Sequence, residues 1–124
     1  MTARLQFKRM PAPWRREIKL LVGRIARGFR PKRIIVFGSA ARGVVGPHSD
    51  VDLLIVKNTR LAFYSRAAAA YRTLRGMKRS LPVDIFVYTE RELDDRQALG
   101  DYFVVQALSE GKVVYEQRAA GRAR

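Results

Sequence analysis

The chain of 124 residues contains no cysteine and a single histidine. The absence of cysteine excludes disulfides, thiolate zinc sites, iron–sulfur clusters and a cysteine nucleophile. One histidine excludes a metal cage built from several imidazoles. No apolar run approaches the ~20 residues that a membrane span needs, and no signal-peptide pattern follows the basic N-terminus. We therefore expect a cytoplasmic protein with no membrane association.

Acidic residues are also scarce, and they are unevenly distributed. Against 25 lysines and arginines the chain has 11 aspartates and glutamates, which gives a net charge of +14. Residues 1–33 hold eleven basic side chains and one acid, and residues 60–79 hold six basic side chains and no acid. This balance predicts an anionic partner unless the basic residues only form a solvated helix face.

The charge fits several anionic partners: a nucleic acid, a nucleotide, an acidic protein face or a lipid surface. A nucleic acid would bind through the basic residues 1–33. We favour the acidic protein, because no aromatic platform or recognisable nucleic-acid module accompanies the charge.

Hydrophobic spacing predicts one mixed α/β domain over residues 12–116, between a basic arm at 1–11 and a basic tail at 117–124. Three helices are expected at about 13–29, 61–79 and 99–110, and a short helix follows the capping box of Thr89 and Glu92. Strands are expected at 33–37, 51–56, 83–88 and 112–115.

The middle helix is expected to bury an apolar face made of Leu61, Tyr64, Ala68, Tyr71 and Leu74. The helix-borne aromatic residues are interpreted as core packing rather than as a base-stacking platform: Trp14, Tyr64, Tyr71, Tyr102 and Phe103.

Three aspartates lie beside or inside apolar strands. Asp50 and Asp52 are two positions apart at the start of a strand, so both side chains point to one face. Two such carboxylates repel each other unless a cation lies between them, which makes the pair a candidate divalent-metal site. Asp84 completes a three-carboxylate cluster if its strand is adjacent, and oxygen ligands alone select Mg²⁺ or Mn²⁺. Alternatively, Asp50 and Asp52 only mark the polar start of a strand after a turn, and Asp84 is only a residue at the edge of its strand.

A Gly-Ser pair, Gly38 and Ser39, follows the first buried strand and precedes a segment that could open a helix. Glycine lets the backbone approach a ligand, and N–H groups at a helix start bind anions. Arg42 is placed to clamp a phosphate, with a solvated loop arginine as the alternative. His48 and Ser49 are interpreted as exposed loop and turn residues.

The sequence resembles the nucleotidyltransferase superfamily that includes DNA polymerase beta. The resemblance lies in the order of its motifs: a strand, a Gly-Ser pair, a loop, a strand that begins with Asp-x-Asp, and an aspartate in a later strand. Gly-Ser-Ala-Ala-Arg-Gly at 38–43 and Ser-Asp-Val-Asp-Leu-Leu at 49–54 are most similar to the minimal nucleotidyltransferases. Those small prokaryotic proteins are usually encoded beside a helical HEPN protein, as antitoxin with toxin. The resemblance spans about residues 15–116. It implies a small mixed sheet packed with helices, like the palm core of polymerase beta.

The resemblance also implies roles for the site residues. Three carboxylates would be catalytic and would bind two Mg²⁺ ions: Asp50, Asp52 and Asp84. Asp84 would in addition act on the attacking hydroxyl. Three further residues would hold the triphosphate of ATP or another nucleotide: Gly38, Ser39 and Arg42.

The implied reaction moves a nucleoside monophosphate, AMP from ATP, to a hydroxyl of a partner protein. The chain would then be the antitoxin of a HEPN and minimal-nucleotidyltransferase pair, and its partner the HEPN toxin or another acidic protein. The alternative is a non-catalytic protein that binds nucleotide or nucleic acid and acts by contact. Both homo- and hetero-oligomers are compatible with either reading.

Overall fold

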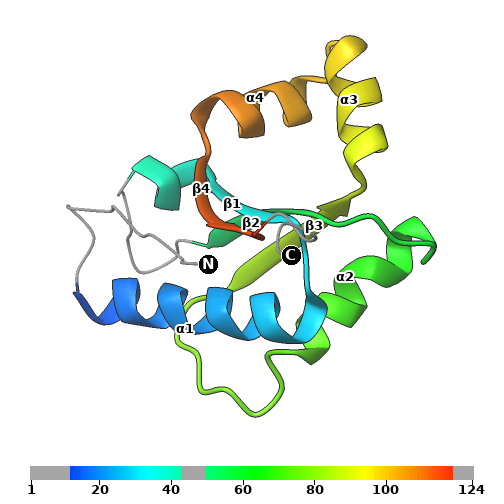
Figure 1. Ribbon diagram of the computed structural model, residues 1–124. Helices are drawn as coiled ribbons and strands as arrows, with labels where there is room; N and C mark the ends of the chain where they lie inside the picture. Colours follow the sequence, from blue (N-terminus) through cyan, green and yellow to red (C-terminus); the bar gives the residue numbers. More distant parts are fainter. Residues whose placement is uncertain (1–11, 43–49, 119–124) are drawn as a thin grey trace.

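The computed structural model describes residues 12–42 and 50–118, which form a four-stranded mixed sheet with helices on both faces (Figure 1). In chain order the elements are α1 (Ala12–Phe29), β1 (Arg33–Phe37), a 3₁₀ helix (Gly38–Arg42), β2 (Val51–Val56), α2 (Phe63–Arg72), β3 (Val83–Tyr88), α3 (Glu90–Ala98), α4 (Tyr102–Glu110) and β4 (Lys112–Glu116). The four predicted strands, the first helix and the short capped helix are confirmed. The predicted arm 1–11, the loop 43–49 and residues 119–124 of the tail lie outside the described residues.

The strand order is β3-β2-β1-β4, with β1 antiparallel to β2 and β4, and β2 parallel to β3. The parallel pair requires a crossover connection, and α2 lies within it. β3 is consequently an edge strand directly beside β2. The predicted α/β class and the adjacency of the two aspartate-bearing strands are both confirmed.

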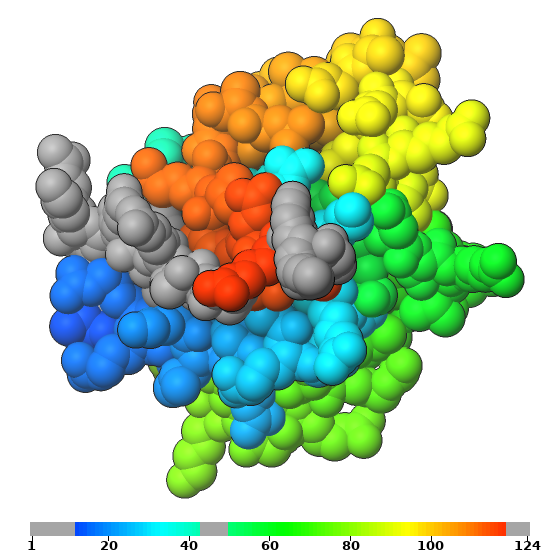
Figure 2. Space-filling view, viewed as in Figure 1, coloured from blue at the N-terminus to red at the C-terminus, as the bar shows by residue number. Residues whose placement is uncertain are grey.

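Helices α1 and α2 cover one face of the sheet, and α3 and α4 cover the other (Figure 1). In the space-filling view, the orange and yellow α4 and α3 lie above the blue and green α1 and α2 (Figure 2). Among the described residues, no helix has the length and apolar character needed to pass through a membrane.

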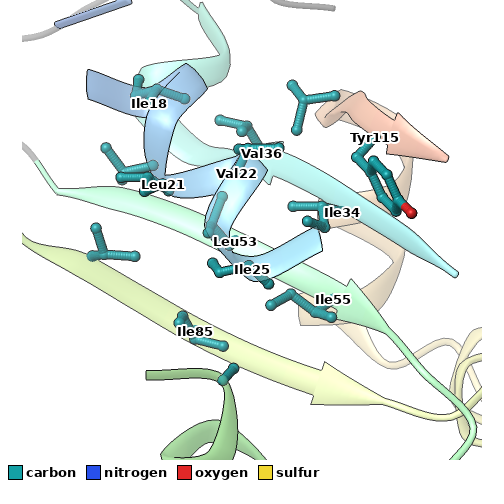
Figure 3. Packing of buried hydrophobic residues seen from close by; sticks show 14 of the residues in the cluster. Ile18, Leu21, Val22, Ile25, Ile34, Val36, Leu53, Ile55, Ile85 and Tyr115 are labelled. Carbon is teal, nitrogen blue, oxygen red and sulfur yellow. The ribbon is translucent and has the colours of Figure 1, made fainter. Parts of the chain in front are cut away.

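The larger apolar cluster forms because α1 is amphipathic. Its apolar residues recur at three- and four-residue spacing and are buried: Ile18, Leu21, Val22, Ile25 and Phe29. Figure 3 shows this stripe against strand residues that include Ile34, Leu53, Ile55 and Ile85. The α3 and α4 side has a smaller cluster that contains Leu54, Val56, Leu93, Val104 and Ala107.

Two helices are shorter than predicted. α2 ends at Arg72, because the following residues form turns and Gly76 has a φ of +81°. α4 begins at Tyr102 rather than near 99, since the Asp101 carboxylate caps it by accepting the Val104 N–H at 3.2 Å.

α2 also turns the opposite face to the core from the one predicted. Leu74 is buried as expected, but Leu61, Tyr64 and Ala68 are exposed, and the helix buries Arg66 and Ala70 instead. The prediction failed because apolar periodicity does not anticipate a buried arginine whose guanidinium nitrogens each have a hydrogen-bond partner. The Arg66 guanidinium binds both carboxylate oxygens of Glu92, at 2.6 and 3.1 Å.

The aromatic residues predicted to pack in the core fall into two groups. Phe103 and Trp14 are partly buried against the apolar clusters, as expected. Tyr64 and Tyr102 are 85% and 77% exposed, and the ring of Tyr71 lies at the surface. The core interpretation is wrong for Tyr64 and Tyr102, because their helices present other faces to the sheet. It is also wrong for the Tyr71 ring, which lies at the surface although its hydroxyl hydrogen-bonds to β3.

Candidate active site

The candidate site lies at the end of the sheet where β1 finishes and where β2 and β3 begin. Phe37 of β1, Asp52 of β2 and Asp84 of β3 stand side by side in the strand register. Side chains alternate across a strand, so Asp52 and Asp84 share the sheet face of Leu54 and Phe86, which α3 and α4 cover. The structure thus brings two of the predicted carboxylates together.

The carboxyl group of Asp52 is half-buried, whereas Asp84 is exposed. Burial, then the negative charges of Asp84 and Asp50, and then a hydrogen bond with the Asp84 carboxyl raise the pKa of Asp52 to about 6. Each of these causes penalises negative charge on Asp52. A cation that binds to the pair therefore lowers the free energy of the site.

Asp50 lies one residue before β2 and is exposed. Its charge acts on the pKa of Asp52, so the two groups are electrostatically coupled. Within residues 12–42 and 50–118, however, no three histidine, aspartate or glutamate side chains converge closely enough to hold a metal ion. The all-oxygen donor set fits Mg²⁺. The observed arrangement is a pair of carboxylates, and Asp50 must turn toward it to become a third ligand.

Gly38 directly follows β1 and lies beside the Asp52 carboxylate. Its φ is +76°, a left-handed conformation that favours glycine, and a Cβ at this position would lie 2.5 Å from Oδ2 of Asp52. The sequence assigned this glycine to close approach of a phosphate. The structure adds that glycine leaves the space in which the Asp52 carboxylate lies.

Ser39 and Arg42 follow on the 3₁₀ helix. The Ser39 hydroxyl has no hydrogen-bond partner among the described residues. Arg42 forms an ion pair with Glu110 at 3.8 Å, and both side chains are about half exposed. Since such a long, exposed pair contributes little stability, Arg42 can exchange Glu110 for a phosphate. The six predicted site residues therefore all lie at one end of the sheet.

An aromatic wall that the sequence interpretation missed borders the carboxylate pair. The rings of Phe37, Phe86 and Phe103 pack in mutual contact, with centroids 5.0 to 6.0 Å apart. Phe37 pairs with Asp52 across the strands, and Phe86 shares the face of Asp84. The two-residue spacing of Phe86 from Asp84 is a signal that could have found part of this wall.

Tyr71 of α2 fixes the backbone on both sides of Asp84. Its hydroxyl donates to the Val83 carbonyl at 2.8 Å and accepts the Ile85 N–H at 3.0 Å. β3 is an edge strand, so these backbone groups have no neighbouring strand to pair with. Tyr71 therefore acts as a positioning residue for Asp84, and nothing in the sequence pattern indicated this contact.

Glu17, the one acid of α1, anchors the turn that leads into β3. Its carboxylate accepts hydrogen bonds from the Ser80 N–H and hydroxyl and from the Leu81 N–H, over 2.7 to 3.1 Å. Burial raises the pKa of Glu17, but these hydrogen bonds and the charge of Arg79 outweigh burial and leave the pKa lowered. The ionised carboxylate thus ties α1 to the strand that carries Asp84.

Comparisons with known proteins agree with this geometry. A family model for the nucleotidyltransferase domain matches residues 17–114. The chain belongs to this family. The superfamily resemblance seen in the sequence is confirmed, and the domain is a nucleotidyltransferase. No curated protein matches the chain.

Two solved structures share the fold of this nucleotidyltransferase domain. One is a Sulfolobus solfataricus protein put forward as a nucleotidyltransferase, with 24% identity, a TM-score of 0.56 and coverage of 82% of this chain and 79% of that one. The other is a toxin–antitoxin structure with AMP-PNP, with 20% identity, a TM-score of 0.54 and coverage of 80% and 73%.

Proposed function

We propose that the protein transfers AMP from ATP to a hydroxyl group of a partner protein. The observation that supports this most directly is the in-register pair of Asp52 and Asp84 beside Gly38. Half-burial and mutual repulsion make the pair a place for positive charge, and the metal ion that accompanies a nucleoside triphosphate would bring that charge.

Asp52 and Asp84 would hold Mg²⁺, with Asp50 as a third carboxylate, and Mn²⁺ would serve in its place. The bound metal would neutralise negative charge that develops around the α-phosphorus and on the leaving pyrophosphate. The carboxylate oxygens fit this role in type and in charge, because hard oxygen ligands suit Mg²⁺ and Mn²⁺.

The remaining steps use groups of the chain itself. Gly38 and Ser39 would present an N–H and a hydroxyl to the triphosphate, and Arg42 would leave Glu110 to pair with a phosphate oxygen. Asp84, exposed on the edge strand, would accept the proton of the attacking hydroxyl. A bond forms from the hydroxyl oxygen to the α-phosphorus while the bond to the bridging oxygen breaks, and pyrophosphate leaves.

The proposed acceptor is a HEPN-type toxin, and the chain is its antitoxin. Two observations support a toxin–antitoxin pair. A structure of similar fold is a toxin–antitoxin with AMP-PNP. Residues 38–43 and 49–54 also resemble the minimal nucleotidyltransferases.

A non-catalytic protein that binds a nucleotide and acts by contact is the second candidate. The observation in its favour is that the three aspartates, as described, do not converge on one metal position. The two candidates differ in whether the α-phosphate is transferred.

The test incubates the protein with Mg²⁺, a purified HEPN protein from the same genome, and ATP labelled at either the α- or the γ-phosphate. Label from the α-phosphate should become covalently bound to the partner, and label from the γ-phosphate should not. Asp84→Asn should abolish the transfer, whereas Asp94→Asn on the exposed surface of α3 should not change it. Transfer of the γ-label, or full activity of Asp84→Asn, contradicts the proposal. Binding without any transfer favours the contact mechanism.

A further inference from the structure

Helix α2 turns an apolar stripe away from the core of its own domain. Tyr64 and Ala68 are exposed, and Tyr71 is 36% exposed. Their spacing of four and three residues places them on one helix face. The core receives Arg66 and Ala70 instead, while Tyr64 and Ala68 stay exposed and the Tyr71 hydroxyl hydrogen-bonds to β3.

The stripe continues into a groove of about 570 Å³ beside the C-terminal half of α2 and the turn after it. We call this the α2 groove. Four of its residues are apolar or aromatic: Ala68, Tyr71, Leu74 and Met77. Three are basic: Arg72, Arg75 and Arg79. A Cβ on Gly76 would meet nothing within 4 Å, so the turn leaves space at that point.

Positive charge exceeds negative charge around the α2 groove, where Glu17 interacts electrostatically with Arg79. None of its three arginines forms an ion pair with a described residue. Residues 60–79 include no acid, and Arg24 of α1 adds charge nearby by donating to the Arg75 carbonyl at 2.9 Å. A cationic rim around apolar side chains complements an amphipathic segment with acidic residues.

A nucleic acid fits the α2 groove less well. Single strands bind to basic grooves that also offer free aromatic faces for stacking. The residues that line the groove include one aromatic ring, Tyr71, so the groove lacks the series of rings on which successive bases stack. The other non-basic lining residues are aliphatic or glycine.

We propose that the α2 groove docks an acidic amphipathic segment of the partner protein. This inference rests on the proposed function and names the surface through which the acceptor is held. Tyr71 lines the groove and also holds the backbone on either side of Asp84, whose side chain lies on the opposite face of the sheet. A partner seated there lies beside the edge strand that carries Asp84.

The test uses a fluorescein-labelled helical peptide of glutamate and leucine, about 18 residues long, whose leucines recur every three or four positions. A peptide of the same composition in scrambled order and an oligouridylate of about 12 nucleotides serve as comparison probes. Binding is followed by anisotropy without nucleotide or metal. Failure of the catalytic proposal therefore leaves this measurement unaffected.

Ala68→Arg is the decisive variant because it fills the α2 groove while it adds positive charge. Attraction by charge alone predicts tighter binding of the acidic peptide, whereas docking in the groove predicts binding weaker by roughly tenfold. Leu20→Arg is the matched control, since Leu20 is 64% exposed on α1 and the change adds the same charge on another helix. It should leave the affinity unchanged or slightly raised. Circular dichroism should show both variants folded.

Several results would overturn the inference. Equal affinity of wild type and Ala68→Arg for the amphipathic peptide is one, and equal weakening by Leu20→Arg is another. Tighter binding of the scrambled peptide than of the amphipathic one also contradicts it. Oligouridylate binding that Ala68→Arg abolishes, without an effect on the peptide, assigns the groove to nucleic acid. A wild-type dimer in sedimentation that Ala68→Arg dissociates assigns it to a second copy of the chain.

Discussion

The two faces of the sheet carry opposite charge. Residues 90–110, which contain α3 and α4, have six acidic and two basic side chains. Residues 12–30 and 60–79, which contain α1 and α2, have twelve basic side chains and one acid. Figure 2 shows these halves above and below. Asp52 and Asp84 point toward the acidic half. The basic charge that dominates the composition therefore lies mainly on one face, and the carboxylates proposed for chemistry lie on the other.

The halves are connected around the edge of the sheet by Arg66 and Glu92. Arg66 belongs to α2 but is buried, and it also donates to the Leu61 carbonyl at 3.0 Å. Glu92 belongs to α3 and completes its capping box with Thr89. The hydrogen bond to Arg66 lowers the pKa of Glu92, so this carboxylate stays ionised. Four substitutions test the roles of the two faces: one beside the Asp52 carboxylate, one in this ion pair, one at the edge strand and one within the carboxylate pair.

The largest effect is expected from Gly38→Ala at the site. The new Cβ must displace the Asp52 carboxylate, and a misplacement of about 1 Å near the chemistry costs on the order of 10²-fold in rate. AMP transfer is the measurement. Gly100→Ala is the control, because Gly100 has the same φ of +76° but open space around its Cβ. It should lose some stability and keep its activity. Equal activity losses in both variants would point to backbone strain rather than to Asp52.

Arg66→Ala should produce the largest loss of stability. Removing one partner of a buried ion pair costs about 3–5 kcal/mol, and the partial exposure of Glu92 favours the lower end. Urea unfolding measures the change. Arg72→Ala, an exposed change on the same helix, should stay within about 0.5 kcal/mol of wild type. A loss below about 1 kcal/mol for Arg66→Ala would show that the two faces do not depend on this connection.

Tyr71→Phe should act on the edge strand. It removes the hydroxyl that holds Val83 and Ile85, at a cost of about 1 kcal/mol in stability. Because Asp84 loses its fixed backbone, kcat for transfer should fall several-fold while KM for ATP, set by the Gly38 end of the site, stays unchanged. Tyr64→Phe removes an exposed hydroxyl from the same helix and should change neither value. A rise in KM with unchanged kcat would contradict the positioning role.

Asp52→Asn should change the free energy of unfolding only slightly, and in the stabilising direction. The raised pKa means that folding favours the protonated Asp52, so its contribution to stability is full below the unfolded pKa of 3.8 and is lost as pH rises through about 6. At pH 8, in a chelating buffer, the variant should be more stable by about 1 kcal/mol, a value discounted for the solvent that reaches the group. The gain should vanish near pH 4. Thermal unfolding against pH measures it, and a variant less stable than wild type at pH 8 would sink this explanation.

Most of the fold could be predicted from the sequence, because the strands and the first helix follow simple apolar patterns. Strand alternation correctly put Asp52 and Asp84 on one face of the sheet, whereas Asp50, predicted to share the strand face of Asp52, lies one residue before β2. The orientation of α2 could not be predicted, because it depends on a buried Arg66 that is stabilised by Glu92, 26 residues away in the sequence. The contact of Tyr71 with β3 was hidden for the same reason. Such hydrogen bonds depend on tertiary geometry, which a local pattern does not encode.

The central claim is that Asp52 and Asp84 form the cation-binding pair of a nucleotidyltransferase. The most direct measurement is titration of Mn²⁺ by electron paramagnetic resonance, in the presence of a non-hydrolysable ATP analogue. Wild type and the double variant Asp94→Asn with Asp95→Asn should bind Mn²⁺ alike, since both of those aspartates are exposed on α3. The double variant Asp52→Asn with Asp84→Asn, which has the same net charge as that control, should bind none. Unchanged Mn²⁺ binding in the Asp52 and Asp84 double variant would contradict the account.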